Sequence, residues 1–240
     1  MLVQISTRAA DDRVAPKPST LRHNEFGDRQ ALQGLSERGY SPKVIFDVGA
    51  AVGNWTRMAL EFWPAAEYFL FEALAERKPD LERLAAETGA KVNVVLGGVG
   101  KEDGPLTMGV TDSLFDSSFA YAGNQARQIE CHRLDSLHRG GRLPKPGFLK
   151  MDVQGFELNV LEGGQEALSD CAVVLMECQF FAFCESMNTL DKTIAVMASY
   201  GFVPYEFVDF LRRPLDGAMG QCDIVFVRRG HWLVSDVRWG

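Results

Sequence analysis

The sequence has 240 residues, of which 46% are hydrophobic, and its formal net charge is −7. This length suits one large domain, and no apolar run approaches the roughly 20 residues that a membrane-spanning helix needs. The negative charge argues against nucleic acid as the usual partner. Five scattered cysteines without a C-x-x-C pair, and no apolar signal segment near the start, favour reduced thiols in a cytoplasmic protein.

The start of the chain is polar and contains Pro16 and Pro18. We therefore expect a flexible arm over 1–26, followed by a single domain over 27–240. Beyond the arm, short apolar runs alternate with helical patterns that end at glycine or proline, which predicts helices and strands in turn. The expected elements are a helix over 28–39, a strand over 43–48, a helix over 54–63, a strand over 67–71, a helix over 77–87 and a strand over 91–96.

This alternation is interrupted over about 104–133. Two runs there, 105–110 and 127–133, look extended, and no helical pattern lies between them. We interpret the segment as an insertion of antiparallel strands and loop that covers a substrate. Its Ser, Asp, Phe and Tyr side chains could contact a polyhydroxylated acceptor, although an exposed loop would have the same composition.

After the insertion the alternation resumes. The expected elements are a strand over 147–151, a helix over 157–168 that is interrupted at Gly163 and Gly164, a strand over 172–178, a helix over 190–200, and strands over 202–208 and 223–227. Helical crossovers give parallel pairing, whereas the loop between the last two strands gives antiparallel pairing. We expect an α/β, Rossmann-like sandwich with a mostly parallel seven-stranded sheet and an antiparallel C-terminal hairpin.

One segment, V-I-F-D-V-G-A-A-V-G-N, reads as a strand, a glycine turn and a helix start. Gly49 and Gly53 permit close approach of a ligand to the backbone, and the N–H groups of a helix beginning near Asn54 attract an anionic group. Asp47 adds a negative charge at the end of the strand. S-adenosylmethionine (SAM) has the carboxylate and the cationic centre that such a loop suits, so these four residues are candidate cofactor ligands.

Acids also stand at the ends of three later strands, namely Glu72, Asp152 and Glu177. Ligands of open α/β sheets bind at the carboxyl ends of strands. Glu72 follows the glycine loop by about 20 residues, the position from which an acid accepts hydrogen bonds from ribose hydroxyls. Asp152 is a second candidate at the cofactor.

Several segments combine into one resemblance: I-F-D-V-G-A-x-V-G-N-W-T at 45–56, Y-F-L-F-E-A at 68–73, L-K-M-D-V-Q-G-F-E at 149–157, L-E-G-G at 161–164 and C-D-I-V-F-V at 222–227. Together they resemble the FkbM family of SAM-dependent methyltransferases. The resemblance implies a class I methyltransferase fold and methyl transfer to oxygen, often a hydroxyl of a sugar or natural product. The chain departs from the family at Ala51, usually asparagine, and at Gln154, usually glutamate.

A hydroxyl acceptor needs to lose its proton, so a general base within hydrogen-bond reach would help. The candidates are Asp152 and Glu177, with His132 and Glu157 less favoured, and we assign no metal. The expected partner is a small-molecule or glycan acceptor, with no nucleic acid and no membrane, and a homodimer is possible. Two alternatives stay open: an inactive binding or scaffold protein that keeps the fold, and a NAD-dependent oxidoreductase.

Overall fold

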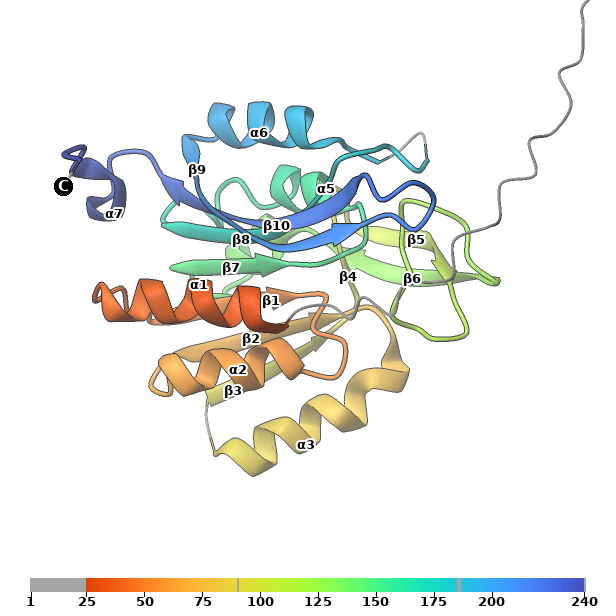
Figure 1. Cartoon of the computed structure of the whole chain (residues 1–240). Helices are drawn as coiled ribbons and strands as arrows, with labels where there is room; N and C mark the ends of the chain where they lie inside the picture. Colours follow the sequence, from red (N-terminus) through yellow and green to blue (C-terminus); the bar gives the residue numbers. More distant parts are fainter. Residues whose placement is uncertain (1–24, 90, 185–186, 240) are drawn as a thin grey trace, which may run out of the picture.

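The computed structural model describes residues 25–89, 91–184 and 187–239 (Figure 1). Most of the predicted arm, residues 1–24, lies outside the described part of the chain. The last two residues assigned to the arm belong instead to the first helix, α1 (Glu25–Glu37).

A seven-stranded sheet forms the centre of the molecule, in the order β3-β2-β1-β7-β8-β10-β9 (Figure 1). Its strands are β1 (Val44–Val48), β2 (Glu67–Glu72), β3 (Lys91–Leu96), β7 (Phe148–Met151), β8 (Val173–Gln179), β9 (Phe202–Arg212) and β10 (Met219–Arg228). β10 runs antiparallel to both of its neighbours, and the other pairings are parallel. This confirms the predicted mostly parallel sheet with an antiparallel hairpin at its end.

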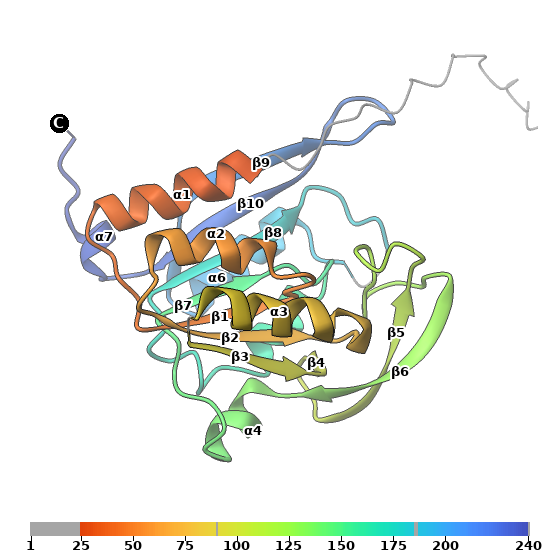
Figure 2. The ribbon, with the colours of Figure 1, turned by 90° about the horizontal axis from the view of Figure 1, so that it is seen from below.

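Helices cover both faces of this sheet (Figures 1 and 2). α1, α2 (Asn54–Phe62) and α3 (Lys78–Thr88) lie on one face, and α5 (Glu157–Glu162) and α6 (Leu190–Ser199) lie on the other. The strands serve both layers because successive side chains point to opposite faces. In β1, Ile45 joins the core beneath α1 to α3, while Phe46 joins the opposite core.

The segment over 104–133 departs from the central sheet. Its two extended runs form β5 (Gly104–Val110) and β6 (Gln125–His132), which pair antiparallel, and β4 (Gly98–Val99) completes a three-stranded sheet in the order β4-β6-β5. This small sheet stands beyond the carboxyl end of the parallel strands (Figure 2). The loop between β5 and β6 can therefore reach any ligand bound at that end.

Some elements differ from the sequence expectation. The helices α4 (Leu134–Arg139) and α7 (Trp232–Ser235) were not predicted, because each is too short for a helical period to register. The helix expected over 157–168 ends at Glu162, at the predicted interruption, and it does not resume as a helix after Gly164. A Cβ atom at Gly163 would lie 1.9 Å from the carbonyl oxygen of Gly100.

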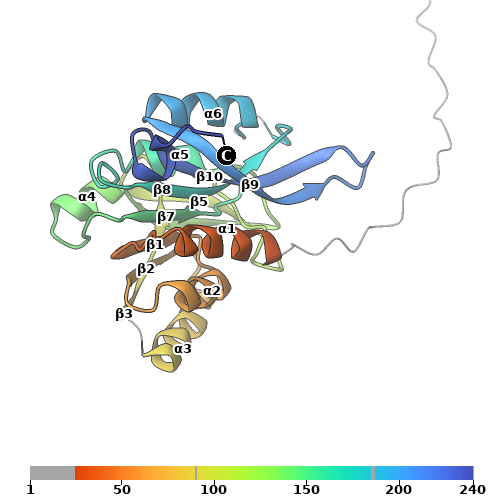
Figure 3. The same ribbon diagram turned by 60° about the vertical axis from the view of Figure 1, so that its left-hand side comes forward.

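The last hairpin is longer than predicted and projects from the sheet (Figure 3). β9 and β10 keep pairing as far as Met219 opposite Arg212, beyond the apolar runs that marked them in the sequence. A short 3-10 helix, η1 (Ala75–Arg77), follows β2. Within the ranges that the structure describes, none of the helices combines the length and the apolarity that a membrane span requires.

Candidate functional site

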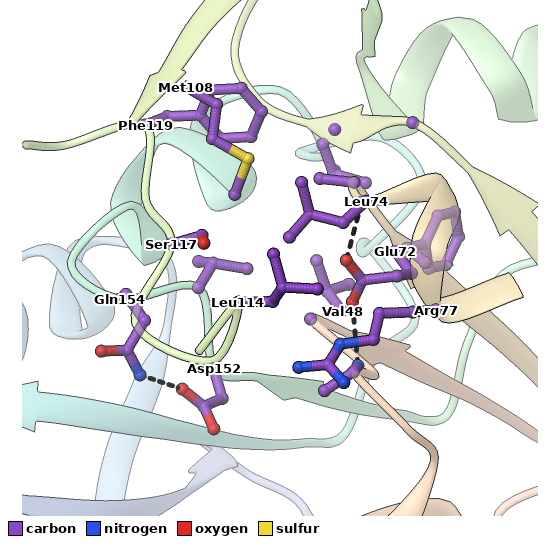
Figure 4. Close-up of a pocket in the computed structure, with 18 of the residues that line it drawn as sticks. Val48, Glu72, Leu74, Arg77, Met108, Leu114, Ser117, Phe119, Asp152 and Gln154 are labelled. Carbon is purple, nitrogen blue, oxygen red and sulfur yellow. Dashed lines mark hydrogen bonds between the residues drawn. The ribbon is translucent and has the colours of Figure 1, made fainter. Parts of the chain in front are cut away.

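A cavity opens where β1 and β7 end side by side. The chain leaves these neighbouring strands in opposite directions, towards β2 and towards β8, and such a switch point is the usual ligand site of an open α/β sheet. Its wall includes Val48, Glu72, Leu74, Arg77, Met108, Leu114, Ser117, Phe119, Asp152 and Gln154 (Figure 4).

The glycine loop forms one side of this cavity. Gly49 has a φ of 78°, and a Cβ atom added to it would lie 2.0 Å from the backbone oxygen of Asp152. Its N–H group donates to the carbonyl oxygen of Phe71 at 3.0 Å. Gly49 therefore packs closely against the end of β2 and the loop after β7, and it lines the cavity.

The second loop glycine has a different position. Gly53 has a φ of 82°, and a Cβ atom there would lie 2.5 Å from Cδ2 of Leu84, so the residue packs α2 against α3. Gly53 is not among the residues of the cavity wall. We therefore revise its predicted role from cofactor contact to helix packing.

Asp47 also lies beneath the loop instead of on the wall. Its side chain is fully buried, Nζ of Lys150 lies 3.1 Å from Oδ1, and the hydroxyl of Thr56 donates to Oδ2 at 2.7 Å. Lys150 also donates to the carbonyl oxygen of Gly49 at 3.1 Å. We revise the prediction that Asp47 contacts the cofactor directly. Both of its carboxylate oxygens face protein groups, namely Lys150 and Thr56.

Lys150 keeps its charge in this position. Burial lowers the pKa of Lys150, but the carboxylates of Asp47 and Asp152 favour the ammonium form and raise the pKa above its ordinary value. The buried pair is thus an ion pair under the loop, and removal of either partner would leave an uncompensated buried charge.

Glu72 faces the cavity from the end of β2. Its Oε1 accepts the N–H of Leu74 at 2.8 Å, and its Oε2 accepts the N–H of Ala51 at 2.9 Å (Figure 4). Burial raises the pKa of Glu72, while these two N–H groups and the nearby Arg77 oppose that rise. Since a carboxylate oxygen can accept more than one hydrogen bond, the fixed carboxylate can still accept bonds from a ligand.

Asp152 is the most accessible of the predicted acids. Its side chain is 40% exposed, and it belongs to the walls of both the cavity and an adjoining groove. Oδ1 accepts the side-chain amide of Gln154 at 2.9 Å, and Oδ2 lies 4.0 Å from Nζ of Lys150. Gln154 has a φ of 55°, and its side-chain amide points towards Asp152 (Figure 4).

Glu177 is covered. It is buried, and its two carboxylate oxygens accept the side-chain amides of Gln179 and Gln221, each at 2.5 Å. Burial, followed by the carboxylates of Asp152 and Glu157, raises the pKa of Glu177 well above its usual value. We revise its predicted role as a general base, because the carboxyl group is buried and both of its oxygens already accept side-chain amides.

Glu157 is a structural residue as well. Its Oε1 accepts the N–H groups of Val153 at 3.0 Å and of Gly155 at 3.2 Å, which fixes the loop after β7. Burial raises the pKa of Glu157 to about 7. It therefore supports the Asp152 loop from below.

The loop between β5 and β6 closes the cavity on the side opposite β1. The guanidinium of Arg77 lies 4.2 Å from the ring centroid of Phe115, and it donates to the carbonyl oxygen of Ser113 at 3.1 Å. Leu114 and Ser117 line the same cavity as Glu72. The expected substrate cover thus also encloses the predicted cofactor side.

The adjoining groove is the part of the site that the sequence did not reveal. Asp28, Asp209 and Asp223 lie in its wall, and we call it the acidic groove. It also contains Asn54, a predicted cofactor ligand, and it shares Gly49, Ala51, Phe115, Asp152 and Gln154 with the cavity. Two residues of this groove could have been suspected from the sequence, because each is a lone charge inside an apolar strand. They are Lys150 in F-L-K-M and Asp223 in C-D-I-V-F-V.

Comparison with known proteins agrees with this geometry. The sequence model of the "Methyltransferase FkbM domain" matches residues 47–204, which begin in β1 and include the cavity-lining ends of β1, β2 and β7. The hexuronic acid methyltransferase AglP of Haloferax volcanii is 27% identical over 190 residues, with 74% of this chain and 73% of that protein covered.

Solved methyltransferase structures give weaker likenesses. The methyltransferase FkbM from Methylobacillus flagellatus KT has a TM-score of 0.49 and 17% identity; the match covers 77% of this chain but 43% of that one, so this chain spans less than half of its length. Aeropyrum pernix fibrillarin, solved with natively bound SAM, has a TM-score of 0.49 and 15% identity. The match covers 84% of this chain and 76% of fibrillarin. The strand order of the central sheet, more than these likenesses, defines the fold. Because the matched domain takes up more than half of the sequence, the chain belongs to the FkbM family of methyltransferases.

Proposed function

We propose that this methyltransferase uses SAM to methylate a hydroxyl group of a sugar, a glycan or a secondary metabolite. The observation that carries the cofactor assignment is Glu72, whose carboxylate is fixed by two backbone N–H groups at the wall of a cavity at the switch point of the sheet. The relative that acts on a hexuronic acid supports a carbohydrate acceptor.

The residues present suit the parts of SAM. Glu72 would accept hydrogen bonds from the ribose hydroxyls, and the apolar side chains of Leu74, Met108 and Phe119 would enclose the adenine. The first N–H groups of α2, near Asn54, would attract the carboxylate. When bound, SAM would supply an electrophilic methyl group on its sulfonium.

Asp152 is the residue that we propose as the general base. An acceptor hydroxyl that gains a methyl group releases a proton, and the partly exposed carboxylate of Asp152 would take it. Gln154 holds the other oxygen of the same carboxylate, which fixes its orientation. Much of the rate would come from positioning of the hydroxyl between the cavity and the acidic groove.

The experiment is a calorimetric titration with S-adenosylhomocysteine. Glu72→Gln should weaken binding about 10- to 150-fold, which corresponds to the loss of hydrogen bonds to a charged group. Glu76→Gln is the matched control, because Glu76 lies on η1 and pairs with Arg127 at the surface. Equal affinity of the two variants would reject the ribose role of Glu72.

A second measurement addresses the reaction. Methyl-labelled SAM is incubated with candidate acceptors, beginning with hexuronic acid glycans, and Asp152→Asn is compared with the parent. We expect labelled product with the parent and a large loss of turnover with Asp152→Asn. Binding of S-adenosylhomocysteine without transfer to any acceptor would favour the scaffold alternative. We also propose a cytoplasmic location, which is supported by the buried thiols of Cys131, Cys171, Cys178 and Cys222 that form no disulfide.

A further inference from the structure

Three carboxylates from distant parts of the chain meet in the acidic groove. Asp28 lies on α1, Asp209 on β9 and Asp223 on β10. One oxygen from each lies within 4.8 Å of the others. α1 runs alongside the β9–β10 hairpin in the views of Figures 2 and 3, so this meeting is produced by the packing of the first helix on the last strands.

The backbone is adapted to bring these groups together. A Cβ atom at Gly27 would lie 2.6 Å from Oδ1 of Asp209, so glycine allows the first turn of α1 to approach β9. Asp209 has a φ of 49° at an irregularity in the pairing of β9 with β10. The N–H of Asp28 donates to Oδ2 of Asp209 at 3.1 Å.

Asp28 supplies a second and independent observation. The residue is 9% exposed, and its Oδ1 is closed to solvent and accepts no hydrogen bond in the structure as described. Buried carboxylate oxygens almost always have a partner. One oxygen of the Asp28 carboxylate lies within 4.8 Å of oxygens of Asp209 and Asp223, so a cation bound among the three groups would supply the missing partner.

The surrounding charges favour a cation there. Asp152 adds further negative potential around the cluster. Lys150 is a nearby positive charge that also acts on Asp28, and its ammonium group is held at 3.1 Å by Asp47. Since the three donors are oxygens, the site suits a hard cation and not a soft one that selects sulfur.

We propose that Asp28, Asp209 and Asp223 bind a divalent cation of the Mg²⁺, Mn²⁺ or Ca²⁺ class. Oxygens on opposite sides of such an ion are separated by about 4.2 to 5.2 Å, twice the metal–oxygen distance, which fits the spacing of the cluster. Three carboxylates leave coordination positions for water or for an acceptor. If the proposed function holds, the cation would bind neighbouring hydroxyls of a sugar beside Asp152, which lies in the same groove.

The test measures cation binding to the full chain without SAM and without acceptor. Protein treated with a chelator and dialysed is titrated with Mn²⁺, and free Mn²⁺ is followed by electron paramagnetic resonance; Mg²⁺ and Ca²⁺ are then used as competitors. We expect one Mn²⁺ per chain. Asp28→Asn and Asp223→Asn should weaken Mn²⁺ binding by at least about tenfold, the least that loss of a partner of a metal site costs.

Glu206→Gln is the matched control, because Glu206 also lies on β9, three residues before Asp209 and outside the cluster. Its Mn²⁺ affinity should equal that of the parent. If the Asn variants fail to fold, the melting temperature of the metal-free parent is measured with and without Mn²⁺. A cation that binds the folded state raises this temperature, so we expect an increase.

Two results would overturn the proposal: no binding of Mn²⁺, Mg²⁺ or Ca²⁺ to folded, stripped parent, or equal affinities for Asp223→Asn and Glu206→Gln. The first would mean that Asp28 and Asp209 share a proton instead of a metal. S-adenosylhomocysteine is titrated into the same stripped sample. Its binding without any cation binding would reject the cation site alone, whereas cation binding without it would reject the cofactor assignment alone.

Discussion

The cavity and the acidic groove open at the same edge of the sheet and share Gly49 and Asp152, yet their acids are stabilised differently. In the cavity, Glu72 accepts two backbone N–H groups from residues within 21 positions of it. In the groove, Asp28 and Asp209 are 181 positions apart and face each other. Local loops thus fix the carboxylate of Glu72 at the cavity wall, whereas long-range packing brings the acids of the groove close to one another.

The largest effect is expected where the two regions meet, at Lys150. Lys150→Met should lower the free energy of unfolding by about 3–5 kcal/mol, because Asp47 would stay buried without its partner. Urea denaturation measures the change. Lys145→Met is the matched control, since Lys145 pairs with Asp170 at the surface, where an ion pair is worth about 1 kcal/mol or less. Similar losses in both variants would contradict the role of the buried pair.

The second prediction concerns Gly49, which lines both the cavity and the acidic groove. Gly49→Ala adds a methyl group 2.0 Å from the backbone oxygen of Asp152 and strains a φ of 78°, so we expect a loss of about 3 kcal/mol. The same change at Gly34, in the middle of α1, meets no atom within 4 Å and should stabilise the protein by about 0.5–1 kcal/mol. Opposite signs in urea denaturation would confirm the contrast, and a tolerated Gly49→Ala would contradict it.

The third prediction concerns Glu157, which should make the free energy of unfolding depend on pH. The pKa of Glu157 is raised to about 7 in the folded state, against 4.5 as its ordinary value. Between these two pH values the folded protein binds a proton that the unfolded chain has lost, so this group makes stability fall as pH rises through that window and no further above it.

Glu157→Gln removes this titration and keeps an oxygen for the N–H groups of Val153 and Gly155. Relative to the parent, its free energy of unfolding should improve by about 2 kcal/mol between pH 5 and pH 7, since each unit of pKa shift corresponds to about 1.4 kcal/mol. Glu162→Gln at the exposed end of α5 should show no such trend. A pH-independent difference for Glu157→Gln would exclude the raised pKa.

The smallest effect is expected at Ala51, in the glycine loop. Ala51 has a φ of 47°, a conformation that asparagine adopts more readily than alanine, and asparagine is the usual residue of the family there. Ala51→Asn should therefore stabilise the protein by about 0.5 kcal/mol. Ala50→Asn, at a buried position without a positive φ, should destabilise it in the same thermal and urea measurements. Destabilisation by both changes would show that the loop conformation does not select the residue.

The alternating elements, the mostly parallel sheet and the end of the sheet at which the cavity lies can be predicted from the amino-acid sequence. These follow from local patterns: apolar runs, glycine turns and acids at strand ends, each read within a few residues of its neighbours. Gly49, Glu72 and Asp152 were found in this way, and all three line the cavity.

The contacts of each acid could not be predicted from the sequence, because they depend on tertiary packing. Asp47 and Glu177 stand at strand ends like Glu72, but their side chains are buried against Lys150 and against two glutamine amides. The acidic groove depends on the packing of α1 against β9 and on an irregularity in the β9–β10 pairing. A sequence pattern records the face and the end of a strand, whereas burial and charge pairing depend on which distant elements cover that end.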